Sequence, residues 1–123
     1  MEFDLLSKQV IGFAIDVHRE LGPGLLESAY EKCLAHELTA HGLEYVVQMV
    51  LPVEYKGLHL DCGYRVDLMV EGRLIVELKS VDTLQPIHAA QLLTYLKLAH
   101  IKTGLLINFN TRLLKNGIKR FRL

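Results

Sequence analysis

Two apolar stretches near the middle of the sequence contain two carboxylates and a lysine that could do chemistry together. Asp67 lies in YRVDLMV, and Glu77 and Lys79 lie in GRLIVELKSV, separated by one leucine. Charged side chains are seldom buried unless they are paired or bind a metal. Two carboxylates can hold a divalent cation such as Mg²⁺, and a neighbouring lysine can orient or deprotonate water. These residue types are therefore suited to metal-assisted hydrolysis of a phosphodiester bond, provided that the fold brings them to one face.

The register of the two predicted strands decides whether these side chains meet. Strand side chains alternate between the two faces of a sheet, so a one-residue slip moves a side chain to the opposite face. A two-residue loop at 71–72 would divide the apolar side chains between the faces. A three-residue loop at 71–73 pairs Asp67 with Glu77 and brings Lys79 to the same face. We predict the three-residue loop, which places these residues on the other face: Tyr64, Val66, Leu68, Val70, Leu74, Val76 and Leu78.

The meeting of two carboxylates leaves two interpretations open. Carboxylates opposite each other on a sheet repel, so a positive charge is needed to offset the repulsion. Lys79 could supply that charge in an ordinary salt bridge on an exposed sheet face. A divalent cation could supply it in a metal site, because Mg²⁺ binds a few carboxylates and completes its octahedron with water. Spacing alone does not separate the salt bridge from the metal site.

The remaining sequence predicts one mixed α/β (α+β) domain that covers residues 1–123. From Phe3 onward, apolar residues recur at spacings of three and four, which is typical of an amphipathic helix. Pro52 predicts an edge position or a bulge, since proline cannot donate a sheet hydrogen bond. Asn116-Gly117 predicts a two-residue hairpin turn. The predicted order is α-α-β-β-β-α-β and a C-terminal hairpin, with helices at 3–21, 25–41 and 85–100 and strands at 45–55, 58–70, 73–80 and 103–109.

Composition limits the classes of protein to which the chain can belong. About half of the 123 residues are apolar, which is enough for one ordinary core. No stretch reaches the roughly 18–20 apolar residues of a membrane-spanning helix, so we expect no membrane partner. The first segment, MEFDLLSKQV, lacks the cationic region of a secretory signal. Cys33 and Cys62 form no C-x-x-C motif, so reduced thiols and a cytoplasmic location are expected.

The two halves of the chain carry opposite charge, although the net charge is zero. Residues 1–62 hold four Lys/Arg and ten Asp/Glu, a balance of −6, and residues 63–123 hold ten and four, a balance of +6. The segment TRLLKNGIKRFRL holds five basic residues, Lys119 and Arg120 among them, and no acid. This asymmetry favours an anionic partner such as nucleic acid. A solvated strand edge protected by Lys and Arg gives the same pattern, so both interpretations stand.

The spacing of the charged residues resembles a known motif. Asp67, nine intervening residues and then Glu77-x-Lys79 resemble the D…(D/E)-x-K core of the PD-(D/E)xK nuclease superfamily. The predicted order helix–strand–strand–strand–helix–strand is also similar to the core of that superfamily. The resemblance implies a restriction-endonuclease-like core with a mixed sheet flanked by helices. It further implies that Asp67 and Glu77 bind Mg²⁺ or Mn²⁺ and that Lys79 is catalytic. The carbonyl group of Leu78 would be a further metal ligand.

Two other segments resemble relatives of that superfamily. GLLESAY, from Gly24 to Tyr30, resembles the signature of the GxxExxY family, which is grouped with these nucleases. HAAQLLTYL, which contains Gln91 and Tyr95, resembles the Q-x-x-x-Y helix of RecB-like nucleases. The first resemblance implies that Glu27 reaches the metal directly or through water. The second implies that Gln91 and Tyr95 contact the substrate or brace the site, whereas the helical pattern alone also allows them to form the solvated side of the helix.

Together these resemblances imply a Mg²⁺- or Mn²⁺-dependent nuclease that hydrolyses phosphodiester bonds of nucleic acid. Gln91, Tyr95, Lys119 and Arg120 would engage the substrate. The alternative is a catalytically inactive nucleic-acid-binding or assembly module that retains the nuclease fold. A chain of 123 residues leaves no room for a separate recognition domain. Sequence specificity would therefore need a homodimer or a partner protein.

Three of the candidate residues also have explanations that need no metal. A carboxylate in the first turn of a helix is favoured by the helix dipole, which accounts for Glu27. Tyr30 shares a helix face with apolar residues, so we expect it in the core with its hydroxyl group on a polar partner. His18 precedes the LGPG segment, where some RecB-like nucleases have a metal-ligating histidine. A histidine at a helix C-terminus also interacts favourably with the dipole.

Overall fold

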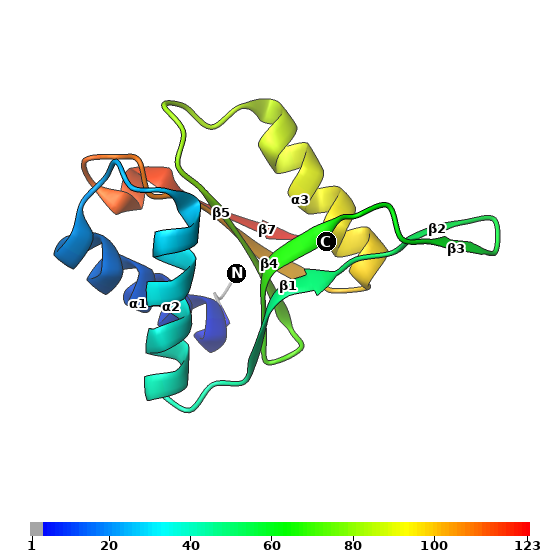
Figure 1. Cartoon of the computed structure of the whole chain (residues 1–123), viewed down its shortest axis with the longest axis horizontal. Coiled ribbons are helices and arrows are strands. Elements are labelled where there is room, and N and C mark those ends of the chain that lie inside the picture. Colours follow the sequence, from blue (N-terminus) through cyan, green and yellow to red (C-terminus); the bar gives the residue numbers. More distant parts are fainter. Residues whose placement is uncertain (1–3) are drawn as a thin grey trace.

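A five-stranded mixed sheet runs through the centre of the molecule and carries helices on both faces (Figure 1). The computed structural model describes residues 4–123. Its elements are α1 (Leu5–Leu21), α2 (Glu27–Ala40), β1 (Tyr45–Val50), β2 (Val53–Tyr55), β3 (Leu58–Leu60), β4 (Arg65–Val70), β5 (Leu74–Lys79), α3 (Pro86–Ala99), β6 (Thr103–Asn108), the 3₁₀ helix η1 (Leu114–Gly117) and β7 (Ile118–Arg122). The sheet order is β1-β4-β5-β6-β7, with β5 and β6 parallel and the other neighbours antiparallel. This arrangement confirms the predicted α+β fold class and the mixed sheet.

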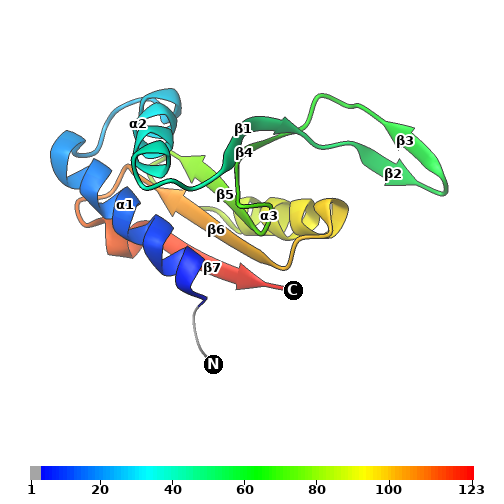
Figure 2. The same ribbon diagram turned by 90° about the horizontal axis from the view of Figure 1, so that it is seen from below.

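Two hydrophobic cores lie on opposite faces of the sheet (Figure 2). Helices α1 and α2 cover one face, and α3 covers the other. Burying each Leu or Val side chain stabilises the fold by about 1.5–3 kcal/mol, so both layers hold the central strands in place. The strand residues of the first core are Leu68, Val70, Leu74, Val76, Leu78, Leu105 and Ile107, and those of the second are Val66, Met69, Ile75 and Leu106.

Helix α1 begins and ends at residues with identifiable capping roles. The carboxylate of Asp4 accepts hydrogen bonds from the backbone N–H and the hydroxyl group of Ser7, both at 2.8 Å. This N-cap satisfies a donor that the first helical turn leaves unpaired. Gly22 ends the helix with a φ of 71°, a left-handed conformation that glycine adopts at little cost. Phe3, which belongs to the predicted helix, lies outside the described residues. In residues 4–123 no helix has the length and apolar character needed to cross a membrane.

The β4–β5 hairpin has the register that the apolar pattern predicts. Val70 pairs with Leu74, and Leu68 pairs with Val76, which leaves a three-residue loop at 71–73. Gly72 within this loop has a φ of 62°, so it supplies the left-handed residue that such loops require. The three-residue loop is therefore confirmed.

One part of the predicted face assignment is wrong. Val66 packs in the core beneath α3, and the ring of Tyr64 meets Tyr95 of α3. The alternation predicts both on the face that carries Leu68 and Val70, which α1 and α2 cover in the structure. Regular pairing of β1 with β4 is interrupted at Asp67, because Gln48 opposite it has a φ of 51°. Side-chain alternation does not continue through this irregular position, so the residues before Asp67 change face.

The two long strands predicted at 45–55 and 58–70 are each broken. The first divides into β1 and β2 around Pro52, and the second divides into β3 and β4 at residues 61–64. Strands β2 and β3 pair only with each other and project from the body of the molecule as a separate hairpin (Figures 1 and 2). The predicted edge position for this region is confirmed, since β1 is the outermost strand of the main sheet.

The predicted turn at Asn116-Gly117 is wrong. These residues are the last two of η1, and the tail continues as β7, which pairs with β6. Neither residue has the positive φ that a two-residue hairpin turn needs. Gly117 has a different function, because a Cβ atom there would lie 2.3 Å from the backbone oxygen of Asn108. The glycine is therefore required by close packing and not by turn geometry.

Two glycine substitutions should change stability in opposite directions. Gly117→Ala should lower the free energy of unfolding by about 1–3 kcal/mol, because the new methyl group overlaps a backbone atom that cannot easily move. Gly12→Ala on the exposed side of α1 should raise it by roughly 0.5–1 kcal/mol, because nothing lies within 4 Å and alanine favours the helix. Urea denaturation of both variants measures these changes. Equal effects of the two substitutions would contradict the packing at Gly117.

Candidate active site

The side-chain carboxylates of Asp67 and Glu77 accept backbone N–H groups at the place where the regular hydrogen-bond pairing of β4 with β5 ends. The ladder of paired residues ends at Leu68 and Val76. At the next position the N–H of Asp67 donates to Oε2 of Glu77 at 2.7 Å, and the N–H of Leu78 donates to Oδ2 of Asp67 at 2.8 Å. Each carboxylate thus satisfies a buried backbone donor of the opposite strand, which would otherwise be costly. The two side chains therefore meet, as the predicted register requires.

The position of Glu77 makes its negative charge unfavourable. Its side chain is 4% exposed. Burial raises the pKa of the carboxyl group to about 8, and the charge of Asp67 adds to the increase. The charge of Lys79 opposes this effect, but in residues 4–123 no salt bridge within 4.0 Å joins the lysine to a carboxylate. The simple salt-bridge interpretation is therefore not what the structure contains, and the carboxylate pair lacks a full counter-charge.

Glu31 and Gln48 extend the carboxylate cluster, and the sequence did not identify either residue. Nε2 of Gln48 donates to Oε2 of Glu31 at 2.6 Å and to Oδ1 of Asp67 at 3.1 Å. Burial raises the pKa of Glu31, and the charges of Asp67 and Glu27 raise it further. The signal that could have indicated Glu31 is its i, i+4 spacing from Glu27, which puts both on one helix face. No sequence signal predicts the left-handed conformation of Gln48.

Glu27 is the first residue of α2 and lies near the carboxylate pair without contacting it. Its charge contributes to the raised pKa of Glu77 and of Glu31. The loop that leads to Glu27 is tied to the end of β5, because the hydroxyl group of Ser80 donates to the backbone oxygen of Leu25 at 2.7 Å. The helix N-terminus is therefore held at the same end of the sheet as the pair.

Tyr30 has the structural role that its helix face predicts. Its hydroxyl group donates to the backbone oxygen of Gly22 at 2.6 Å and accepts from the N–H of Leu25 at 3.1 Å. Its ring is fully buried and stacks on Phe109 with centroids 4.3 Å apart. Tyr30 therefore positions the turn before α2, and through it the carboxylate of Glu27.

The segment after Lys79 is held by the end of β6. The N–H of Phe109 donates to the backbone oxygen of Lys79 at 2.9 Å. The side-chain amide of Asn108 binds both the N–H and the carbonyl oxygen of Val81, at 3.1 and 2.9 Å. Asn108 is buried, so these bonds are shielded from water. They fix the backbone that carries Lys79 beside the pair.

Helix α3 brings Tyr95 to the site. Tyr95 packs with Val66 and Ile75, which flank the carboxylate pair along β4 and β5. Burial raises the pKa of the Tyr95 hydroxyl group, and the charges of Glu77, Tyr64 and Asp67 raise it further. Gln91 is half-buried and lies one helical turn before Tyr95 on the same side of α3.

His18 does not join the carboxylate cluster. Its Nε2 lies 2.7 Å from the backbone oxygen of Thr111, and its ring lies 6.4 Å from that of Phe109. This contact ties the end of α1 to the loop between β6 and η1. His18 therefore has a partner that accounts for its burial.

Lys119 and Arg120 lie on β7, two strands away from Glu77. Lys119 pairs with Leu106, which also pairs with Glu77, so the backbones are about 10 Å apart. Arg120 is the next residue, so it points to the opposite face. Helix α3 packs on β6 between the two strands. The two basic residues are therefore not brought into direct contact with the pair.

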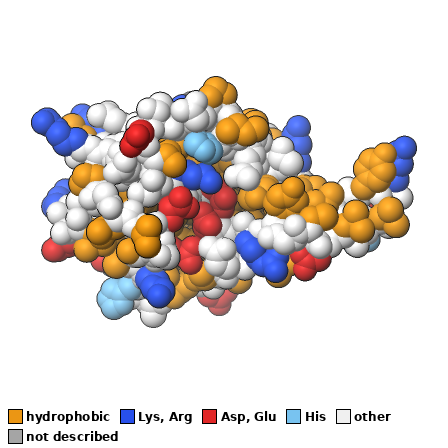
Figure 3. Space-filling view, turned by 45° about the horizontal axis from the view of Figure 1, so that its top comes forward, with side chains coloured by type: hydrophobic (Ala, Val, Ile, Leu, Met, Phe, Trp, Pro, Cys, Tyr) orange, Lys and Arg blue, Asp and Glu red, His pale blue; other side chains and the backbone are white. Residues whose placement is uncertain are grey.

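The surface around the site combines charge with apolar area. Figure 3 shows Asp and Glu side chains gathered in the middle of one face, with basic side chains beside them. Hydrophobic side chains continue from this cluster toward the projecting hairpin. The face therefore offers both an acidic centre and an apolar flank.

The donor set of the cluster fits a magnesium-like ion. In the described part of the chain, no three Asp, Glu, His or Cys side chains form a complete metal cage. Mg²⁺ does not require such a cage, because one or two carboxylates suffice when water fills the other positions. Asp67 and Glu77 supply two hard oxygen donors, and the charge of Lys79 only partly offsets their repulsion. A divalent cation would relieve that repulsion.

The fold and the site together define a class of protein. A mixed sheet flanked by helices carries Asp67 on β4 and Glu77 and Lys79 on the adjacent β5. The family model of the PD-(D/E)XK nuclease superfamily matches residues 4–121, and the chain belongs to this superfamily. Comparison with curated proteins and with solved structures gave no match.

The raised pKa of Glu77 predicts a specific pH dependence for the metal-free protein. A carboxyl group whose pKa rises from 4.5 to about 8 on folding stabilises the fold below pH 4.5, and this stabilisation is lost as the pH rises to 8. The loss amounts to about 1.4 kcal/mol per pH unit within this window. Glu77→Gln keeps an uncharged side chain at all pH values. Relative to the wild type, the variant should therefore become steadily more stable between pH 5 and 8, as measured by urea denaturation with a chelator present. A difference in the free energy of unfolding between the variant and the wild type that stays constant from pH 5 to 8 would contradict the raised pKa of Glu77.

Proposed function

We propose that the protein is a Mg²⁺- or Mn²⁺-dependent nuclease that hydrolyses phosphodiester bonds of nucleic acid. Membership of the PD-(D/E)XK superfamily supports nuclease activity. The observation that carries the proposal is that the carboxylates of Asp67 and Glu77 each accept a backbone N–H of the opposite strand, with Lys79 two residues after Glu77. The GLLESAY segment supports a finer assignment to the GxxExxY family.

Asp67 and Glu77 would hold the cation, with the carbonyl group of Leu78 and the carboxylate of Glu27 as further ligands. A bound divalent ion lowers the pKa of water and neutralises charge on a phosphate group. The backbone bonds at Asp67 and Leu78 fix both carboxylate groups before any ligand arrives. This preorganisation supports the proposal, because a site that is already in place needs little rearrangement for catalysis.

Lys79 would orient the attacking water and stabilise the negative charge that develops on the phosphate group. The charge of Lys79 lowers the pKa of Glu77, which supports a role for the lysine at the carboxylate pair. It forms no short salt bridge in the described chain, so its hydrogen-bond donors are available to a substrate. These two properties suit a residue that acts on water or phosphate.

Gln91 and Tyr95 would contact the substrate or brace the site from α3. The burial of Tyr95 and its packing beside the carboxylate pair favour bracing. Lys119 and Arg120 would bind phosphate groups farther along the nucleic acid, since β7 lies away from the pair. Contacts of this kind contribute affinity without sequence preference.

Metal binding should stabilise the wild type and require Glu77. At 100 times the dissociation constant, a ligand that binds only the folded state adds about 2.7 kcal/mol. We expect Mn²⁺ to raise the melting temperature of the wild type and of Glu54→Ala, which removes an exposed carboxylate on the projecting hairpin. Glu77→Gln should abolish the increase while retaining an acceptor for the N–H of Asp67. Absence of stabilisation by millimolar Mn²⁺ in the wild type would refute the metal site.

Cleavage should require both the metal and Lys79. Single- and double-stranded DNA and RNA are incubated with Mg²⁺ or Mn²⁺, and products are resolved on denaturing gels. Lys79→Ala should reduce the rate by about 10²–10⁴-fold, the usual contribution of a positioned proton-transfer group. Lys8→Ala, an exposed lysine on α1, should leave it unchanged. If Lys79→Ala cleaves as fast as the wild type, the activity does not come from this site. If Mn²⁺ binds but no substrate is cleaved, the chain is a non-catalytic member of the superfamily.

A further inference from the structure

Tyr64 presents an exposed aromatic ring beside the carboxylate pair. The residue is 44% exposed, although it precedes Asp67 by only three positions. Its ring meets Tyr95 edge to face, with centroids 6.1 Å apart and an interplanar angle of 63°. Tyr95 belongs to the same buried cluster as Val66, the residue directly before Asp67, and the charges of Glu77 and Asp67 raise the pKa of its hydroxyl group. The ring of Tyr95 therefore connects Tyr64 to the surroundings of the carboxylate pair.

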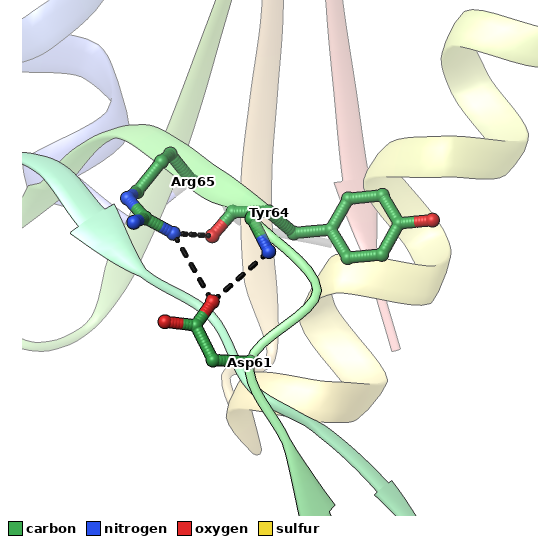
Figure 4. A network of polar contacts seen from close by, with 4 residues as sticks. Asp61, Tyr64 and Arg65 are labelled. Atoms are coloured by element: carbon green, nitrogen blue, oxygen red, sulfur yellow. Dashed lines mark hydrogen bonds and ion pairs between the residues drawn. The ribbon is translucent and has the colours of Figure 1, made fainter.

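The backbone that carries Tyr64 is held from several sides (Figure 4). A carboxylate oxygen of Asp61 accepts from the N–H of Gly63 at 2.9 Å and from Arg65 at 3.5 Å. The same guanidinium nitrogen of Arg65 donates to the backbone oxygen of Tyr64 at 2.9 Å, and the N–H of Leu51 donates to that oxygen at 3.0 Å. Figure 4 shows the ring extended from this network toward α3. The exposed ring is thus carried by fixed backbone and not by a loose loop.

The surroundings of Tyr64 are suited to a nucleobase and poorly suited to a duplex backbone. Asp61 and Arg65 lie 3.5 Å apart and offset each other's charge. Val50 and Leu60, at the two ends of the neighbouring strands, are exposed and apolar. Proteins that bind duplex DNA neutralise several phosphate groups with Lys and Arg. Single-strand binders instead stack unpaired bases on aromatic side chains.

We propose that Tyr64 stacks on an unpaired nucleobase and that the preferred substrate is single-stranded nucleic acid or an unpaired end. This inference rests on the proposed nuclease function, because the stacked base would place an adjacent phosphodiester at Asp67 and Glu77. Paired bases in a duplex already stack on their neighbours, so they cannot offer a face to this ring. Tyr64 would thus be a substrate-positioning residue, while the carboxylates and Lys79 perform the chemistry.

Binding measurements with matched variants test the proposal. Fluorescence anisotropy with chelator present compares a labelled single-stranded oligonucleotide with the duplex of the same sequence. Tyr64→Ala should weaken single-strand binding by about 5- to 100-fold, the usual effect of losing one base–aromatic stack. Tyr64→Phe should bind within about twofold of the wild type, because phenylalanine keeps the ring. Tyr55→Ala, which removes a tyrosine that is 58% exposed on the projecting hairpin, should have no effect.

An oligonucleotide with consecutive abasic nucleotides gives a test that needs no variant. The wild type should bind the abasic strand more weakly than the intact strand, by about the factor expected for Tyr64→Ala. The affinities of Tyr64→Ala and the wild type for the abasic strand should be equal. The ratio of the dissociation constants of Tyr64→Ala and the wild type for the intact strand should also persist as the salt concentration is raised, since stacking does not depend on counterion release.

The outcomes separate this inference from the proposed function. If the wild type cleaves or binds nucleic acid and Tyr64→Ala behaves identically, the stacking proposal is overturned and the nuclease proposal stands. A wild type that binds duplex more tightly than single strand, or abasic strands as tightly as intact ones, also overturns it. If the wild type neither binds nor cleaves any nucleic acid, both proposals fail. Loss of binding in Tyr64→Ala with rescue by Tyr64→Phe supports the stack even when no cleavage is seen.

Discussion

The site depends on two hydrogen bonds by which the carboxylates of Asp67 and Glu77 each bind the backbone of the opposite strand. Strands β4 and β5 pair regularly up to Leu68 and Val76, and beyond that point the side chains replace the ladder. The bonds satisfy buried N–H groups, so the fold itself holds the acidic groups in place. The two carboxylates therefore take part in joining β4 to β5. Burial of Glu77 raises the pKa of its carboxyl group, and the charge of the neighbouring Asp67 raises it further.

The remainder of the fold keeps this contact from relaxing. Apolar cores on both faces of the sheet hold β4 and β5 at their positions. At the end of β5, the amide of Asn108 binds the backbone of Val81, and Ser80 binds the backbone of Leu25. Tyr30 fixes the turn before α2 through its hydroxyl group. These bonds join segments far apart in the sequence, so they hold the backbone after Lys79 and the turn before Glu27 in place.

Much of the fold follows from local patterns, and the errors occur where long-range contacts override them. The β4–β5 register could be predicted because only one register gives most aliphatic residues a common face. Asn116-Gly117 was assigned to a turn because its sequence favours one, whereas Gly117 is needed for close packing against Asn108. The face of Val66 was assigned by alternation, which fails because Gln48 distorts the pairing at Asp67. Glu31 was overlooked because its partners lie on β1 and β4.

By itself, the sequence determined which ionisable groups are available and that Asp67 must face Glu77, because both depend on residue type and a period of two. Tertiary structure decided how strongly the pair is buried, that Gln48 joins Asp67 to Glu31, and that Tyr64 lies against Tyr95 beside the site. Those contacts join elements that are distant in the chain, and their energies depend on burial and on the direction of individual bonds. A local sequence pattern encodes neither the burial of a side chain nor the direction of its hydrogen bonds, since both arise only when the helices have packed on the two faces of the sheet.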